Sequence, residues 1–189
     1  MKKVLNLLVL ATLLLSSSLG FSQEDKPKKN LMPFFAGGAN FGGTVSSNNF
    51  LYSSGISAQI GMLHQLTDQV QIGVGVGIVN FDNDYFYPVF FRVDAAIFKN
   101  PNAKLLLQSG FSWAENRSDV SLSSVDLDGG YFIETGRLWS FDLGENVNLF
   151  TSMSFRYQFA HLEYSFENAH SESRVDYMSV NIRGGILLK

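Results

Sequence analysis

The sequence predicts an all-β protein: an eight-stranded, antiparallel, up-and-down barrel that crosses a membrane. Eight segments alternate apolar and polar residues, the period of a β-strand. The 189-residue chain is rich in aromatic residues and glycine, with 17 Phe, 7 Tyr and 17 Gly. Beyond its first residues it nevertheless has no apolar run long enough for a membrane helix, which needs about 20 residues. Short and long links also alternate between the segments, as they do in a meander whose two ends differ.

The first 22 residues are typical of a secretory signal peptide. Lys2 and Lys3 precede an apolar run from Val4 to Leu15, and small or polar residues continue to Ser22. The apolar run is too short to span a bilayer as a helix, so a retained anchor is the less favoured alternative. We expect residues 23–32 to form a flexible leader and residues 33–189 to form the barrel.

The net charge argues against a nucleic-acid partner, and the lack of cysteine excludes disulfide bonds. The formal net charge is −3, and removal of two signal-peptide lysines gives −3 − 2 = −5. Such a chain lacks the basic stripe of a nucleic-acid-binding protein. It contains no cysteine, although an exported protein enters a compartment that permits disulfides. Packing and hydrogen bonding must therefore stabilise the fold.

The eight predicted strands follow one another through the chain. They are Pro33–Val45, Ser54–Leu66, Val70–Phe81, Val89–Lys99, Lys104–Ala114, Gly130–Phe141, Val147–Ala160 and Arg174–Leu188. The seventh has the clearest alternation, with Met153, Phe155, Tyr157 and Phe159 on one face and Ser152, Ser154, Arg156 and Gln158 on the other. In the sixth, Arg137 falls on the apolar face, which suggests a bulge or a register shift there.

The stretch QIGVGVGIVNF (71–81) has glycine at every second position between branched aliphatic residues. Its spacing does not match GxGxxG, no GK[ST] is present and no helix signal follows, so a phosphate-binding loop is the weaker interpretation. As a strand, it would direct Gly73, Gly75 and Gly77 toward the lumen, leaving room for long side chains. The alternating aliphatic residues Ile72, Val74, Val76 and Ile78 would then face lipid.

The side chains on the two faces of the strands indicate which face is on the outside of the barrel. The polar face includes charged residues near the middle of strands, whereas the opposite face is apolar and aromatic in most strands. An apolar exterior of that size would aggregate in water but suits a bilayer. We therefore predict a polar network in the lumen, formed by Arg92, Asp94, Glu134, Arg156, Gln158, Asn181 and Arg183, and a lipid-facing surface that includes Met153, Phe155, Tyr157 and Phe159.

With the signal ending in FSQ, the eight alternating segments and the alternating links, the chain resembles the small outer-membrane β-barrel families of Gram-negative bacteria. These are the outer membrane protein A and X type and the related "outer membrane protein beta-barrel" domain of Bacteroidetes-like bacteria. The resemblance implies an outer-membrane location, both termini and tight turns on the periplasmic side, and longer loops outside the cell. One departure is the ending GGILLK, where such chains usually finish on an aromatic residue.

Several polar groups qualify as candidate sites, but each has a simpler explanation as a loop or hairpin tip. They are a calcium-loop fragment at Asp126, Asp128 and Gly129, a polar group of Asn80, Asp82 and Asp84, and a cluster of His161, Glu163, His170 and Glu172. We therefore predict no catalytic residue, no metal and no cofactor. Aromatic residues at the ends of the long links, among them Phe50, Tyr52, Tyr85, Phe86, Tyr87 and Trp113, are expected to form an interfacial girdle.

The sequence favours a structural or surface-interaction role for a monomeric barrel with a side-chain-plugged lumen. Its expected partners are outer-membrane lipid and, through the loops, an extracellular protein or glycan; nucleic acid is not expected. One alternative is a soluble secreted or periplasmic β-barrel that encloses a small apolar ligand with its aromatic face. A less favoured alternative is a lipid-modifying enzyme that uses His161 and Ser165 near the outer rim.

Overall fold

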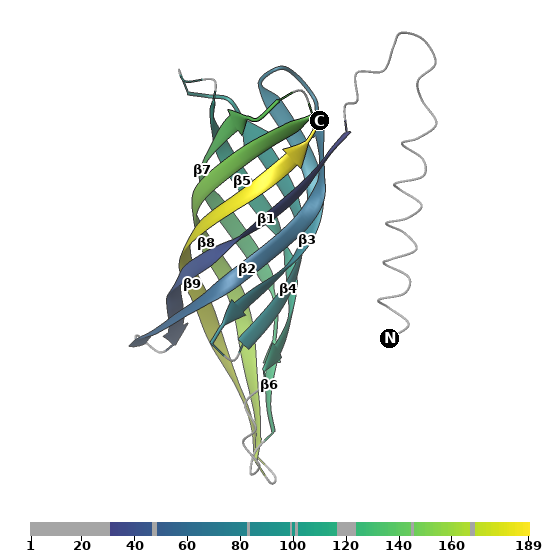
Figure 1. The fold of residues 1–189 in the computed structure, drawn as a ribbon. Helices are drawn as coiled ribbons and strands as arrows, with labels where there is room; N and C mark the ends of the chain where they lie inside the picture. The colour runs from purple at the N-terminus through teal and green to yellow at the C-terminus, as the bar shows by residue number, and fades with distance from the viewer. Residues whose placement is uncertain are drawn as a thin grey trace, which may run out of the picture.

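The computed structural model describes residues 31–46, 49–82, 84–98, 100, 102–116, 124–144, 146–166 and 169–189. They form nine strands (Figure 1): β1 (Leu31–Ser46), β2 (Asn49–Gln65), β3 (Val70–Phe81), β4 (Asp84–Ala95), β5 (Ala103–Asn116), β6 (Ser124–Asp128), β7 (Tyr131–Asp142), β8 (Val147–Phe166) and β9 (Ala169–Leu188). The expected signal peptide and most of the expected leader lie outside the described residues. Within the described part of the chain, no helix is long and apolar enough to cross a membrane.

The strands close into an antiparallel barrel in which each wall strand pairs with its neighbour along the chain. The wall follows the order β1–β2–β3–β4–β5–β7–β8–β9, and β9 pairs back with β1 from Phe34↔Leu187 to Val45↔Asp176. The short strand β6 pairs with β8 beyond the start of β7, so β6 and β7 together form one wall position. The predicted eight-stranded barrel is confirmed.

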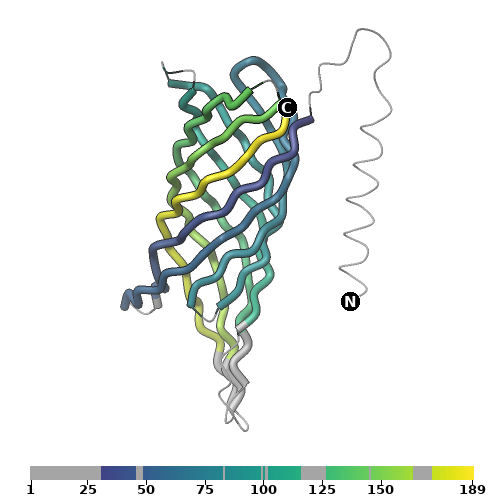
Figure 2. The backbone as a smooth tube through the Cα atoms, in the orientation of Figure 1, coloured from purple at the N-terminus to yellow at the C-terminus, as the bar shows by residue number. Residues whose placement is uncertain are grey.

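The two ends of the barrel differ, and we name them the terminal end and the distal end. β1 begins and β9 ends at the terminal end, which also carries the turns joining β2 to β3, β4 to β5 and β7 to β8 (Figure 1). At the distal end, β6 and the outer parts of β8 and β9 extend past the other strands (Figure 1). These outer parts comprise residues 161–166 of β8 and 169–174 of β9, and with β6 they form the distal sheet. Figure 2 shows the strands of the wall as a backbone tube in the same orientation.

Strands replace much of what the sequence suggested were long links at the distal end. The expected link from His161 to Ser173 is mostly β8 and β9, and the link from Glu115 to Gly129 contains β6. The pairing of β8 with β9 continues to Phe166↔Ala169. Residues 169–174 of β9 (AHSESR) have polar residues at both parities and therefore lack the apolar alternation by which strands are recognised, whereas residues 161–166 of β8 (HLEYSF) do alternate.

The irregularity expected at Arg137 is also absent from the described ladder. β7 pairs with β8 without interruption from Phe132↔Gln158 to Asp142↔Asn148. Arg137 instead lies on the outer surface, where its guanidinium stacks on the rings of Phe98, at 4.3 Å, and Trp139, at 5.4 Å. A cation on the apolar face is thus accommodated by stacking rather than by a bulge.

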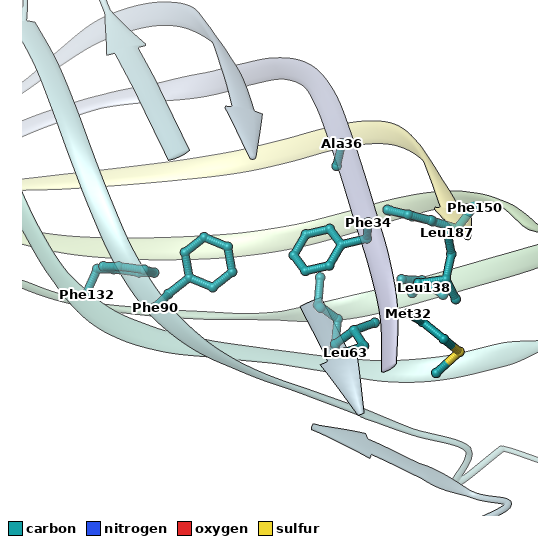
Figure 3. Close-up of a cluster of buried hydrophobic side chains, with 10 residues drawn as sticks. Met32, Phe34, Ala36, Leu63, Phe90, Phe132, Leu138, Phe150 and Leu187 are labelled. Carbon is teal, nitrogen blue, oxygen red and sulfur yellow. The ribbon is translucent and has the colours of Figure 1, made fainter. Parts of the chain in front are cut away.

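Apolar side chains fill a large part of the barrel interior in two clusters. One lies toward the terminal end (Figure 3) and comprises Met32, Phe34, Ala36, Leu63, Phe90, Leu106, Phe132, Leu138, Phe150 and Leu187. The other lies toward the distal end and comprises Val79, Phe81, Phe86, Leu127, Ala160, Val175 and Tyr177. Phe86, which we expected in an interfacial girdle, is therefore a core residue, and its ring packs edge-on against that of Tyr177 at 4.8 Å. Aromatic rings inside the wall fill volume that the narrow interior of an eight-stranded barrel leaves for side chains.

Candidate functional site

The inner and outer faces of the wall differ most clearly along β8. Ser152, Ser154, Arg156 and Gln158 are buried, whereas Met153 is 52% exposed and Phe155 is 46% exposed. The strand period of two directs the first set into the barrel and the second set outward. A charged residue is thus enclosed in the barrel while its apolar neighbours form the exterior.

The same division holds for the residues that we expected to face lipid. On the outer surface, Val74, Val76, Ile78, Met153, Phe155 and Phe159 are exposed, and Ile72 and Tyr157 are half-buried. Tyr157 is covered by outward-facing neighbours: its ring packs edge-on against Phe159 at 4.9 Å, and its hydroxyl donates a hydrogen bond to Asp176 at 2.5 Å. Contact of this surface with lipid stays a prediction.

The seven residues of the expected polar network all lie inside the wall and are buried. Glu134 is at the centre of one group. Its carboxylate accepts two hydrogen bonds from Arg183, one of them over 3.2 Å from Nη2, and a third from Ser154 Oγ over 2.5 Å. Arg156 Nη1 lies 3.8 Å from the same carboxylate. One buried carboxylate therefore serves two buried guanidinium groups.

Gln158 and an aromatic ring support Arg156 from its other side. Arg156 Nη2 donates to Gln158 Oε1 at 2.7 Å and to Ser112 Oγ at 3.1 Å. The Arg156 guanidinium carbon lies 3.7 Å from the centre of the Phe132 ring. Asn181 lies nearby on β9 and accepts a hydrogen bond from Ser179 Oγ at 3.0 Å. The contacts with Gln158, Ser112 and Phe132 fix Arg156 by hydrogen bonds and by stacking.

Arg92 and Asp94 form a separate pair rather than joining Glu134. Arg92 Nε and Nη2 donate to the two Asp94 oxygens at 2.9 and 2.8 Å, a bidentate arrangement. The Arg92 guanidinium also stacks on Phe34, at 4.5 Å, and on Phe150, at 5.3 Å. Since β4 ends at Ala95, this pair lies toward the terminal end of the barrel.

The glycine row lies within β3, so the stretch is a wall strand and not a phosphate-binding loop. Gly75 is buried, and a Cβ atom built on it would lie 2.5 Å from the Phe90 ring. A Cβ on Gly77 would lie 3.1 Å from Gln59 Cγ, and one on Gly73 would lie 2.8 Å from Leu63 Cδ2. The space next to this row is therefore used by an aromatic, a leucine and a glutamine side chain.

The described residues of the other candidate groups do not assemble into a metal site. Among the described residues, no group of three or more His, Asp or Glu side chains is placed to hold a metal ion. Asn80 donates to the backbone oxygen of Asp82 at 2.7 Å, and Asp84 accepts from the Tyr177 hydroxyl at 2.6 Å. The side chains of Asp126, Ser165 and His170 lie outside the described set, so the complete calcium-loop and enzyme hypotheses stay untested.

A cavity at the distal end was not expected from the sequence, although His161, Glu163 and Glu172 of the candidate cluster line it. The β5–β7 ladder ends at Phe111↔Tyr131, with one further hydrogen bond from Ser112 N to Gly130 O at 2.9 Å. Farther out, β6 pairs with β8, and the described residues contain no ladder between β5 and β6. We call the region between β5, from Trp113 outward, and β6 the seam. A cavity of about 420 Å³ opens there between Trp113 of β5 and Glu163 of β8.

No protein-family model matches the sequence, and a search of curated proteins finds no relative. Solved structures do match. Outer membrane protein AlkL, determined by solid-state NMR in DMPC lipid bilayers, has a TM-score of 0.50 and 12% identity over 90% of this chain and 97% of its own. Neisserial surface protein A has a TM-score of 0.46 and 17% identity, covering 80% of this chain and 95% of its own. At such identities the likeness concerns the fold alone: the chain has the fold of bacterial outer-membrane β-barrels.

Proposed function

We propose that this protein is a small outer-membrane β-barrel of the outer membrane protein A and X type, a membrane-embedded scaffold with a closed lumen. In this proposal the terminal end faces the periplasm and the distal end faces the outside of the cell. The distal sheet is the part that meets an extracellular protein or glycan.

The observation that carries this proposal is the fully buried Glu134 between Arg156 and Arg183, inside a wall whose exterior is apolar. A carboxylate is expensive to bury in this way unless guanidinium groups and hydrogen bonds satisfy it. In a soluble carrier the same space would be apolar and open to a ligand. The ionic cluster and the two apolar clusters instead occupy the lumen, which supports a scaffold rather than a wide pore.

The distal sheet supports a surface-interaction role. It continues past the wall strands as a three-stranded unit, in which β6 pairs with β8 from Ser124↔Ser165 to Asp128↔His161. Beyond Val45↔Asp176 no described residue of β1 pairs with β9, so β9 has an outer edge there. An exposed strand edge offers backbone donors and acceptors to an extended partner segment.

The closed lumen is tested by folding the protein into phospholipid vesicles and into a planar bilayer. We expect heat-modifiable mobility on a gel, which indicates a folded barrel, together with no steady ionic conductance. A stable open channel would refute the plugged-lumen scaffold, and recovery of folded protein without detergent or lipid would refute the membrane location.

The soluble-carrier alternative requires the aromatic face to line a cavity. Phe155, Phe159 and Met153 are exposed on the outside of the barrel, which disfavours that alternative. The rim-enzyme alternative has no comparable observation in its favour. Replacing His161 by alanine is its direct test: an altered lipid composition in the producing cells would favour an enzyme over a scaffold.

A further inference from the structure

The seam is a place where the described residues of β5 and β6 are not joined by a ladder. Gly129 lies close against the end of the β5–β7 ladder, so that a Cβ atom built on it would collide with the Ser112 backbone oxygen. From Trp113 outward, the described residues of β5 pair with β4 only, while β6 turns to β8. The described residues of β5 and β6 form no ladder at this level, and the cavity of about 420 Å³ lies beside them. Pockets of roughly 300–1,000 Å³ are typical of small-ligand sites.

The cavity is bordered by both faces of the wall. Phe111 and Trp113 project from the outer face of β5, and their rings pack edge-on at 5.5 Å. Ala114, the next residue, has the opposite orientation: it lines the same cavity and also packs against the distal apolar cluster. An apolar chain in the seam would thus contact rings outside and Ala114 at its floor.

Carboxylates line the other side of the cavity. Asp128 of β6, Glu163 of β8 and Glu172 of β9 border it, and all three side chains are exposed. Glu163 and Glu172 are direct cross-strand partners. Like charges placed directly opposite each other destabilise a sheet, and none of the three carboxylates forms an ion pair with another described residue. The local charge therefore favours a cation in the cavity.

The lining also includes His161, the cross-strand partner of Arg174, whose guanidinium is paired with Asp176. The lining as a whole indicates which kind of cation fits the cavity. These residues do not form a metal-binding group, and a hard metal ion would gain little from the two aromatic rings. An organic ammonium group is attracted both by carboxylates and by aromatic faces. We propose that the seam binds a cationic amphiphile: its ammonium head lies against Glu163, Glu172 and Asp128, and its alkyl chain lies along Trp113 toward Ala114. This inference concerns a site beside the wall and goes beyond the scaffold role proposed above.

The fluorescence of Trp113 can report binding at the seam. The chain has two tryptophans, and the other, Trp139, lies at the far end of β7 beside Arg137. In a Trp139→Phe background, the full-length barrel in neutral-detergent micelles is titrated with a dodecyl-dimethylammonium probe that carries a nitroxide on its head. Bound probe quenches Trp113 fluorescence. An uncharged nitroxide with the same alkyl chain measures simple partition into the micelle.

The test compares two variants that remove equal charge. Glu163→Gln with Glu172→Gln alters the seam, whereas Asp68→Asn with Asp142→Asn alters exposed carboxylates at the terminal end. We expect the seam variant to raise the half-quenching concentration at least tenfold, the control variant to change it less than twofold, and the uncharged probe to require at least ten times more than the cationic one.

Equal quenching by the charged and uncharged probes, or equal affinity in the two double variants, would overturn the proposal. Gel mobility before and after heating confirms that each variant is folded. Phe111→Ala is a second variant that leaves the carboxylates intact, and an unchanged half-quenching concentration there would refute the aromatic part of the site. A conducting lumen would refute the scaffold role but would leave these titrations unaffected.

Discussion

Replacing Glu134 by glutamine removes the only negative charge that contacts both Arg156 and Arg183 among the described residues. The substitution keeps the side-chain volume and one acceptor oxygen, but it leaves two buried guanidinium groups without a counter-charge. Breaking a buried ion pair from one side costs about 3–5 kcal/mol. Because the amide oxygen of glutamine still accepts one hydrogen bond, we expect a loss near the lower limit, about 3 kcal/mol.

Urea unfolding of the barrel from phospholipid vesicles, followed by tryptophan fluorescence, measures this loss. With a slope of about 1–3 kcal/mol per molar urea for a small protein, the midpoint should fall by at least about 1 M. The matched control is Asp142→Asn, which removes an exposed carboxylate paired with Lys189 and should cost less than about 1 kcal/mol. An equally small loss in Glu134→Gln would refute the view that this carboxylate compensates the buried arginines.

Two further predictions concern side chains inside the wall. Gly75→Ala should destabilise the barrel by about 1–3 kcal/mol, because its Cβ would lie 2.5 Å from the Phe90 ring. The control is Gly184→Ala, whose Cβ has no neighbour within 4 Å and which should change the urea midpoint little. Equal effects of the two substitutions would contradict the packing argument. Asp94→Asn should lower stability by about 3 kcal/mol, since it leaves Arg92 buried without its bidentate partner, and a thermal melt of the folded barrel that did not shift would count against this ion pair.

The sequence was sufficient to predict the barrel and its inverted polarity. Strands such as β8 alternate so regularly that the orientation of Arg156 and Phe155 could be assigned from parity alone. The burial of all seven polar-network residues is a matter of parity too. Their pairing is not: Asp94 lies two residues from Arg92 on the same strand, whereas Arg183 reaches Glu134 from another strand, and only the closed register determines such contacts.

The distal end was predicted less well for two physical reasons. In residues 169–174 of β9, polar residues fall at both parities, so the pattern does not mark a strand there; residues 161–166 of β8 (HLEYSF) do alternate but were assigned to a link. The seam depends on where one ladder ends and another begins, at Ser112 and Gly130. Asp128, Glu163 and Glu172 come from three strands, and sequence spacing does not bring them to one cavity. The available signals were the pair of glycines at 129 and 130 and the less favoured cluster that included His161, Glu163 and Glu172.

The methionine methyl groups of the unaltered protein report most directly whether the barrel has an apolar exterior in lipid around a filled interior. Met62 and Met153 lie on the outer surface, whereas Met32 belongs to the apolar cluster at the terminal end. With ¹³C-methyl methionine in lipid bilayers, we predict NMR cross-peaks from acyl-chain protons to Met62 and Met153 and none to Met32. Cross-peaks to Met32 with none to Met153 would contradict this prediction.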